Sequence, residues 1–230
     1  MARTLTSCFS PEHALTRPAR TMIEPHRGSP EFMVLHTLRC LGFASAQRVG
    51  AILEALAPID VEDHLLSLAT QGLVNHHPGE FGGWGVTDAG KMADAEQVLV
   101  ELEQTGARDH VRAAYGDFVD LNQRALDIFG AWQLRTGGTT TSLNDHTDRA
   151  YDSRVLEQLA VLDAEARPLC ARLSAHLYRF SHYRPRLASA LARARSGDLD
   201  QVTDSLDSYH TVWFQLHEDL LVTLGTGREW

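Results

Sequence analysis

Hydrophobic residues recur at helical spacing through two long stretches of the chain, with a short region of strand-like character inside the first. From Met33 onward the spacing predicts three short helices within 33–72, with capping residues or a glycine or proline at their ends. Residues 73–77 and 84–86 are expected to be two strands joined by a glycine-rich turn. Thr87 is placed to cap a longer helix over about 88–104.

The second stretch is almost wholly helical in pattern. Helices are expected over about 107–134, 150–180, 185–197 and 199–224, whereas 136–148 is expected to be a polar loop without a period. Four helices with short connections predict an antiparallel bundle. The predicted fold is therefore mainly α: a winged helix-turn-helix of three helices and a β-hairpin wing at 33–105, followed by a helical bundle at 106–230.

Residues 1–32 show neither a helical nor a strand period and are expected to be a flexible leader. They hold four arginines and four prolines, and they lack the apolar stretch that a secretory signal needs. Residues 27–32 resemble a linker derived from a cloning vector, so Met1 and Met33 both stay open as the natural start.

Two motifs flank the expected hairpin turn. They are Leu65-x-x-Leu68-x-x-x-Gly72-Leu73-Val74 and Trp84-Gly85-Val86-Thr87-x-x-Gly90. Together they resemble the winged-helix domain of MarR- and PadR-type transcriptional regulators. The resemblance implies that the third helix enters the major groove of DNA and that the wing touches the DNA backbone.

The distribution of charge opposes that expectation. The 230 residues carry 21 Lys and Arg against 30 Asp and Glu, a net charge of −9. Within 33–105 there are three basic and ten acidic residues, so this segment alone carries −7. Contacts to DNA phosphates need Lys, Arg or backbone donors. Two hypotheses follow. The chain is either a homodimeric DNA-binding regulator, or an acidic winged helix that binds a protein partner and does not bind DNA.

Under the DNA hypothesis, the side chains available for phosphates and base edges lie on the second and third helices and on the first wing strand. They are Arg48, Ser67, Thr70, Gln71, His76 and His77.

Polar and aromatic residues gather around the expected loop and on the last helix. His210, Trp213 and His217 share one helical face, because they are spaced i, i+3 and i+7. A small polar or anionic ligand between the loop and this helix is one hypothesis. Its candidate ligand-binding residues are Trp132, Asn144, Asp145, His146, Asp148, Tyr209, His210, Trp213 and His217.

Three motifs of this second stretch are distinctive. They are Trp132-Gln133-x-Arg135, Asn144-Asp145-His146-x-Asp148 and Asp207-Ser208-Tyr209-His210-Thr211-Val212-Trp213-Phe214. They are similar to a helical segment of actinobacterial proteins, some of them winged-helix regulators and others linked to pyruvate phosphate dikinases. For the protein-binding hypothesis, this resemblance implies an accessory role in phosphoenolpyruvate and pyruvate metabolism.

The same residues leave two further alternatives open. His146 with Asp145 or Asp148, joined by His176 or His210, forms a mixed nitrogen and oxygen metal site, or else these side chains satisfy one another in the bundle core. Apart from that metal, no cofactor is expected. The sequence shows no catalytic motif, so an enzyme is not expected.

The expected compartment is the cytoplasm. The three cysteines, Cys8, Cys40 and Cys170, are odd in number and widely spaced, which is typical of reduced proteins. No apolar run approaches the ~18–20 residues of a membrane span, so no membrane partner is expected.

Overall fold

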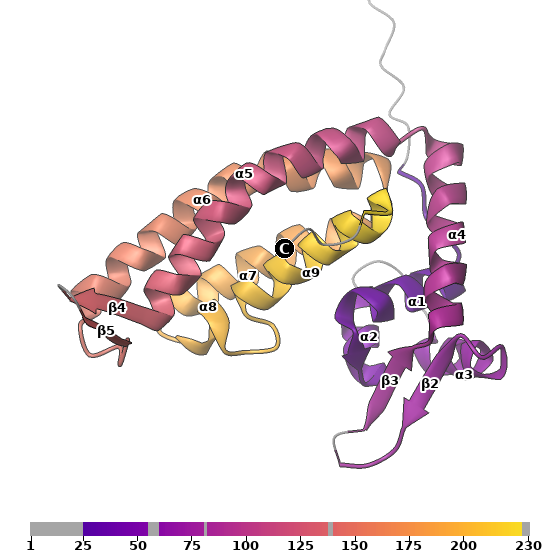
Figure 1. Cartoon of the computed structure of the whole chain (residues 1–230), viewed down its shortest axis with the longest axis horizontal. Helices are drawn as coiled ribbons and strands as arrows, with labels where there is room; N and C mark the ends of the chain where they lie inside the picture. Colours follow the sequence, from indigo (N-terminus) through magenta and orange to yellow (C-terminus); the bar gives the residue numbers. More distant parts are fainter. Residues whose placement is uncertain (1–24, 55–59, 81, 138–139, 227–230) are drawn as a thin grey trace, which may run out of the picture.

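The computed structural model describes residues 25–54, 60–80, 82–137 and 140–226 (Figure 1). Over these residues the protein is mainly helical, as the sequence predicts, and it contains two small antiparallel sheets. None of the described helices is both long and apolar enough to cross a membrane.

The first unit, residues 30–105, holds four helices around a three-stranded sheet. Its elements are α1 (Pro30–Leu41), β1 (Phe43–Ala44), α2 (Ala46–Leu53), α3 (Val61–Thr70), β2 (Val74–His77), β3 (Gly83–Val86) and α4 (Asp88–Thr105). The sheet order is β1-β3-β2, and Trp84 of β3 is opposite Ala44 on one side and His76 on the other. The two-residue strand β1 is too short to give a sequence signal, and it was not predicted.

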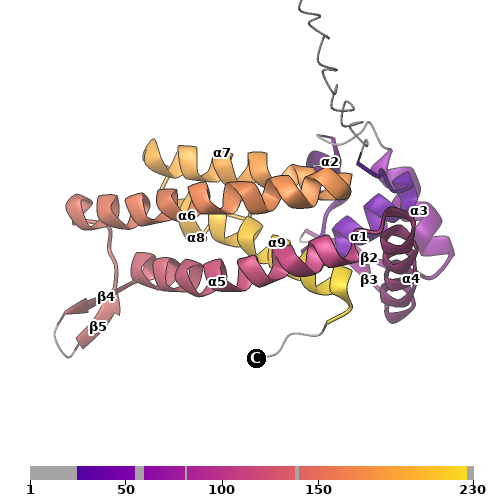
Figure 2. The same ribbon diagram turned by 90° about the horizontal axis from the view of Figure 1, so that it is seen from above.

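The bundle, residues 108–224, follows directly. Its elements are α5 (Arg108–Gln133), β4 (Leu134–Gly137), β5 (Thr140–Leu143), α6 (Arg149–His176), the 3₁₀ helix η1 (Tyr178–His182), α7 (Tyr183–Arg195), α8 (Asp200–Thr203) and α9 (Tyr209–Leu224). The long helices run side by side, with α5 packed on α6 and α9, and α7 packed on the same two helices (Figure 2).

Two expected features of the bundle are wrong. Part of the predicted loop is a β-hairpin, in which Arg135 pairs with Ser142 and Thr136 with Thr141. Threonine suits the pleated surface of a strand, so its polarity alone was a poor guide. The single helix expected over 199–224 is instead the short α8, a turn, and α9, which begins where the Ser208 side chain accepts a hydrogen bond from the Thr211 backbone N–H.

Buried apolar side chains form two clusters, and the first unit contributes to both. One cluster lies inside the first unit, around Leu38, Leu65 and Trp84. The other fills the bundle and also takes in Phe32 from α1 and Val98 and Leu102 from α4. Helix α1 begins at Pro30, three residues before the expected start, because the Ser29 hydroxyl caps it at the Phe32 N–H.

Candidate functional site

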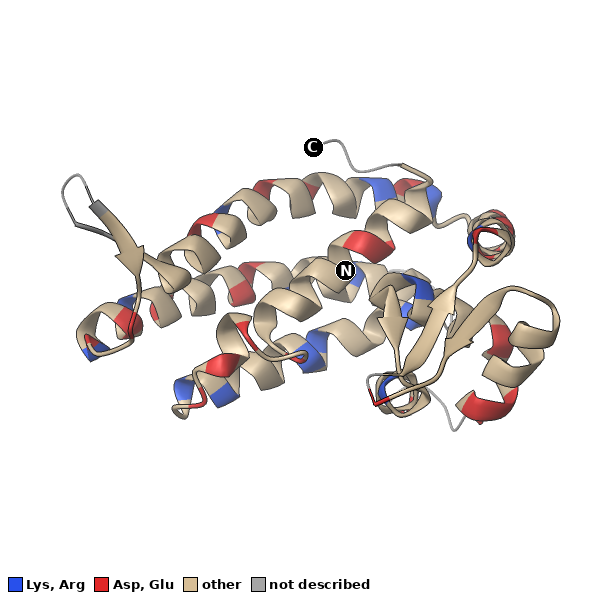
Figure 3. Cartoon of the chain, turned by 60° about the horizontal axis from the view of Figure 1, so that its bottom comes forward, with Lys and Arg blue, Asp and Glu red and all other residues tan. Residues whose placement is uncertain are grey.

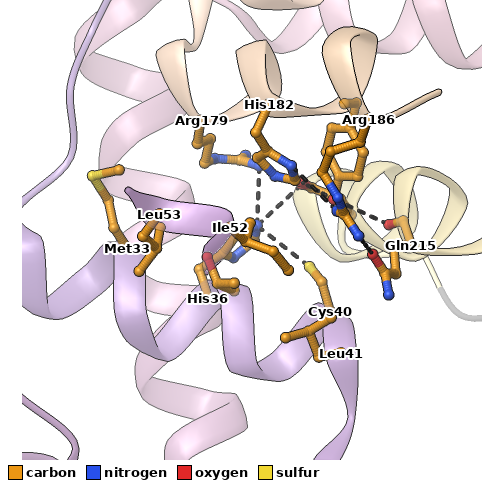
Figure 4. Close-up of a pocket in the computed structure, with 13 residues that line it drawn as sticks. Met33, His36, Cys40, Leu41, Ile52, Leu53, Arg179, His182, Arg186 and Gln215 are labelled. Atoms are coloured by element: carbon orange, nitrogen blue, oxygen red, sulfur yellow. Dashed lines mark hydrogen bonds and ion pairs between the residues drawn. The ribbon is translucent and has the colours of Figure 1, made fainter. Parts of the chain in front are cut away.

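A set of buried charged side chains joins the first unit to the bundle, and Figure 4 shows two of them, His36 and Arg179. The imidazole of His36 on α1 lies between two carboxylates: its Nδ1 is 2.8 Å from Asp94 Oδ1 on α4, and its Nε2 is 3.0 Å from Asp219 Oδ1 on α9. Arg179 in η1 donates from Nε to Glu101 Oε2 on α4 at 2.9 Å, and from Nη1 to the same Asp219 oxygen. We call these five side chains the junction network; none is more than 5% exposed.

The charges of the network are balanced when His36 carries a proton. Arg39 donates to Asp94 Oδ2 at 2.8 Å, so the three carboxylates face Arg39, Arg179 and His36. Burial alone would lower the pKa of His36, but the negative charges around it, Asp94 first among them, raise that pKa well above its usual value. The network is therefore a set of ion pairs in which each buried charge has an opposite neighbour.

A second buried histidine beside the network stays neutral. Burial, reinforced by the nearby positive charge of Arg186, lowers the pKa of His182 to about 3. Its ring lies against that of Tyr183, whose hydroxyl donates to Asp219 Oδ2 at 3.0 Å. The junction thus holds one histidine that is charged at neutral pH and one that is not.

The junction also brings together a set of metal-ligand types, namely His36, Cys40 and Asp219, with donor atoms within 4.8 Å of one another. A guanidinium already lies among them, since Arg179 Nη1 is 3.0 Å from His36 Nε2 and binds Asp219. Burial raises the pKa of the Cys40 thiol, which opposes the thiolate that a metal needs. These residues fit an ion-pair network better than a metal centre.

The residues predicted to read DNA are engaged in contacts within the protein. Gln71 Nε2 donates to Glu31 Oε1 at 2.6 Å, and the Thr70 hydroxyl donates to the backbone of Ser67. The rings of His76 and His77, both exposed, lie against Trp84 and Phe43 of the three-stranded sheet.

Arg48, the basic member of that predicted set, faces the bundle. Its Nη2 donates to the backbone oxygen of Leu206 at 2.5 Å and lies 3.6 Å from Asp207 Oδ1. This guanidinium therefore belongs to the cleft between α2 and the bundle.

The predicted ligand residues divide into two places. At the hairpin end of the bundle, Asn144 Nδ2 donates to Trp132 O at 3.0 Å and to Asp152 Oδ1 at 2.9 Å, and His146 Nδ1 lies 3.2 Å from Asp152 Oδ2. Asp148 caps α6 and pairs with Arg135, while Asp145 accepts hydrogen bonds from Thr147. These residues hold one another in place, which agrees with the structural alternative.

The expected metal group at His146 is not formed among the described residues. Its proposed partner His176 lies at the opposite end of α6, whose 28 residues span about 40 Å at ~1.5 Å per residue, and there it stacks on His110 with ring centroids 3.9 Å apart. The length of α6 therefore keeps the two histidines apart.

The other predicted ligand residues meet in a groove between α5 and α9. His210, Trp213 and His217 share this groove, as their spacing predicted, and its volume is about 370 Å³. Tyr209, in contrast, points into the core, where its hydroxyl donates to Asp163 Oδ1 at 3.3 Å. The groove lining is mainly apolar and aromatic, and Trp213 Nε1 donates to Asn122 Oδ1 at 2.9 Å.

The sequence interpretation missed the junction network. Asp219 was given no role there, although its carboxylate is only 2% exposed. A signal was present on α4, where Asp94 and Glu101 share a buried stripe with Val98 and Leu102. An acid in phase with apolar residues indicates a buried charge that needs a partner.

Comparisons with protein-family models, with curated proteins and with solved structures gave no match for this chain. What the protein does is therefore inferred from its own side chains.

Proposed function

We propose that the first unit is a winged helix that binds a basic protein surface through α3, and that the chain is an accessory protein rather than a DNA reader. The order helix, strand, two helices, hairpin and helix supports the winged-helix interpretation, with α3 in the position of the recognition helix and β2–β3 as the wing. The observation that carries the proposed function is the state of the basic side chains in this unit.

All three basic residues of 33–105 are engaged by the protein itself. Arg39 binds Asp94, and Lys91 binds Asp88 at 2.9 Å. Arg48 binds the backbone of Leu206 and faces Asp207. A phosphate on DNA would have to displace the carboxylate partners of Arg39 and Lys91. Arg48 lines the cleft toward the bundle, not the outward side of α3.

The outward side of α3 has the opposite chemistry. Its first turn carries the exposed carboxylates Glu62 and Asp63, and the side chain of Leu66 next to them is 52% exposed. In Figure 3 the beginning of α3 is red, and no blue lies on that helix. A partner that fits this surface is a protein segment with Arg or Lys around an apolar side chain, because opposite potentials attract and an exposed leucine gains by burial.

A charge reversal on α3 tests the proposal. The double variant Glu62→Lys with Asp63→Lys should no longer recover a cross-linked protein partner from cell extract. The wild-type chain should recover that partner at low salt and lose it at high salt. The matched control reverses two exposed acids on α4, Glu96→Lys with Glu103→Lys, and should keep the partner. The competing function is DNA binding. The proposal is overturned if the wild-type chain binds genomic DNA fragments tightly and in a salt-sensitive way in a mobility-shift assay. It is also overturned if the α3 charge reversal leaves recovery of the partner unchanged.

A second candidate function rests on the groove between α5 and α9. Its volume of about 370 Å³ lies within the range of small-molecule sites, and it exposes Val119, Leu126 and Phe214 beside Trp213. Such a lining fits a small, neutral aromatic molecule better than the polar ligand expected from sequence. The neutral dye N-phenyl-1-naphthylamine should gain fluorescence on binding, and Leu126→Arg should remove that gain, whereas Val161→Arg on α6, outside the groove, should not. Equal fluorescence with both variants would contradict this assignment.

A further inference from the structure

A second cleft lies between α2 of the first unit and α7, α8 and the following turn of the bundle. Its volume is about 450 Å³, which is ample for a small metabolite. Three arginines line it, Arg48 from α2 and Arg186 and Arg193 from α7, against a single carboxylate, Asp207. This is a local excess of positive charge in a chain whose net charge is −9.

The carboxylate in the cleft compensates these arginines poorly. Asp207 Oδ1 lies 3.6 Å from Arg48 Nη2 and 3.8 Å from Arg186 Nη2, so one acid is shared between two guanidinium groups at long distance. The Asp207 side chain is also 65% exposed, which weakens its attraction through solvent screening. Arg193 has its own partner, Asp198, at 2.7 Å. Even with Asp198 included, three positive charges face two negative ones.

Arg186 is the most enclosed of the three. Its side chain is 17% exposed, and its shortest hydrogen bond, 2.7 Å, goes to a neutral acceptor, Gln215 Oε1. Burial lowers the pKa of its guanidinium, although arginine remains protonated at any physiological pH. A buried cation whose nearest carboxylate is distant and solvated carries an uncompensated desolvation cost, and a bound anion offsets that cost.

Neutral hydrogen-bonding groups complete the lining. Ser45 and Ser189 supply hydroxyls, and Gln47 and Gln201 supply amides. Guanidinium groups bind phosphate with two parallel hydrogen bonds, and hydroxyls and amides accommodate the remaining oxygens of an organic phosphate.

We propose that this cleft binds a small phosphorylated organic molecule, with its phosphate held between Arg48 and Arg186 and with Arg193 at the edge. The phosphate takes the place of the exposed Asp207 carboxylate as the counter-charge. Since Arg48 belongs to the first unit and Arg186 to the bundle, the ligand bridges the two. Arg186 also lines the cavity beside His36 and Asp219, so an anion bound to it sits next to the junction network. This site is independent of the proposed partner surface on α3.

Calorimetric titration of the full chain with 3-phosphoglycerate tests the proposal, with inorganic phosphate as the minimal probe and glycerate as the counterpart without phosphate. We expect 3-phosphoglycerate to bind, phosphate to bind more weakly, and glycerate to bind at least tenfold more weakly than 3-phosphoglycerate. Arg48→Gln and Arg186→Gln should each weaken binding about tenfold, the loss expected when one charge-assisted contact of ~1.5 kcal/mol is removed.

The matched control is Arg195→Gln, which removes an arginine of the same helix whose partner, Glu157, lies outside the cleft. It should bind 3-phosphoglycerate as the wild type does. Far-ultraviolet circular dichroism of each variant verifies folding, and Arg48→Gln keeps the test valid should Arg186→Gln unfold. The proposal is overturned by the absence of binding heat for both phosphate probes at millimolar concentration, by glycerate binding as well as 3-phosphoglycerate, or by equal losses in Arg48→Gln and Arg195→Gln.

Discussion

The interior of the bundle and the junction between the units are both buried, yet they are stabilised by different physical effects. Around Leu159, Phe118 and Leu216 the bundle is closed by apolar side chains that are wholly buried. At the junction, Asp94, Asp219 and Arg179 are just as inaccessible but charged. Apolar burial is non-directional and indifferent to pH, whereas buried ions require specific partners and titrate. Apolar burial inside the bundle therefore stabilises its fold, whereas the ion pairs at the junction select one arrangement of the two units.

Removing one cation from the junction should have the largest effect. Arg179→Met keeps much of the side-chain volume but leaves Glu101 and Asp219 without their strongest partner, which should cost about 3–5 kcal/mol of unfolding free energy. Chemical denaturation at pH 7 measures it. Leu159→Ala in the bundle should cost a similar ~2–5 kcal/mol.

Hydrogen exchange distinguishes these two variants. Arg179→Met should lower protection first in α1 and α4, while Leu159→Ala should lower it in α5 and α6. Identical exchange patterns would contradict a junction that is stabilised separately from the bundle.

Acid should weaken the junction through His182. Its pKa in the folded protein is about 3, below the ordinary value of 6.5 that holds in the unfolded chain. The stability it contributes is therefore complete above pH 6.5, and it falls by as much as ~1.4 kcal/mol per pH unit as the pH drops from 6.5 toward 3. In His182→Gln the free energy of unfolding should vary less with pH between 6.5 and 3, as measured by urea denaturation at several pH values. If the variant shows the same pH dependence as the wild type, the interpretation is wrong.

Alkali should act through the other histidine. The pKa of His36 is raised in the folded state, so its contribution is complete below about pH 6.5 and is lost as the pH rises through the folded value. His36→Asn should be less stable than the wild type at pH 6 and should lose less on going to pH 10. A wild-type stability that stays level over this range would count against a charged His36.

The hairpin end offers a smaller test, because its polar groups are neutral or paired nearby. Asn144→Ala removes the donor to Trp132 O and Asp152 Oδ1 and should cost about 1–3 kcal/mol, since both acceptors lie in a largely buried setting. Thermal denaturation measures the loss. A variant as stable as the wild type would show that water replaces the amide at no cost.

The smallest effect is expected where the ions are solvated. Arg124 and Glu165 pair on the surface of α5 and α6 with nearly half of each side chain exposed. Arg124→Gln should change the unfolding free energy by at most ~1 kcal/mol, and 1 M salt should erase the difference. If Arg124→Gln lost as much unfolding free energy as Arg179→Met, solvent exposure would not explain the difference in strength between surface and junction ion pairs.

Periodicity in the sequence predicted the helices well because it reports local burial. It identified α4 and α5 to within a few residues, and it placed His210, Trp213 and His217 on one face. It did not reveal which charges meet, because His36 and Asp219 are 183 positions apart and only the packing of α1 on α9 brings them together. The hairpin was missed for another reason: a threonine-rich segment satisfies both a loop pattern and a strand pattern.

Arg48 shows the same limit from the functional side. As an isolated basic residue on a helix of a winged-helix pattern, it was interpreted as a DNA contact. Its position against Leu206 and Asp207 is set by the turn between α8 and α9, which the sequence pattern had merged into one helix.

The backbone pairing of His26 with residues 176–178 determines how the protein can be divided into fragments for experiments. The backbone of His26 bonds to that of His176 and Tyr178, so the segment before α1 is fastened to the bundle. A fragment that starts at Met33 and stops at residue 105 would lose this attachment and the Ser29 cap, and it would bring Asp94 and Glu101 into water without Arg179. Such a fragment would report on an altered surface, so binding assays of the first unit call for the whole chain.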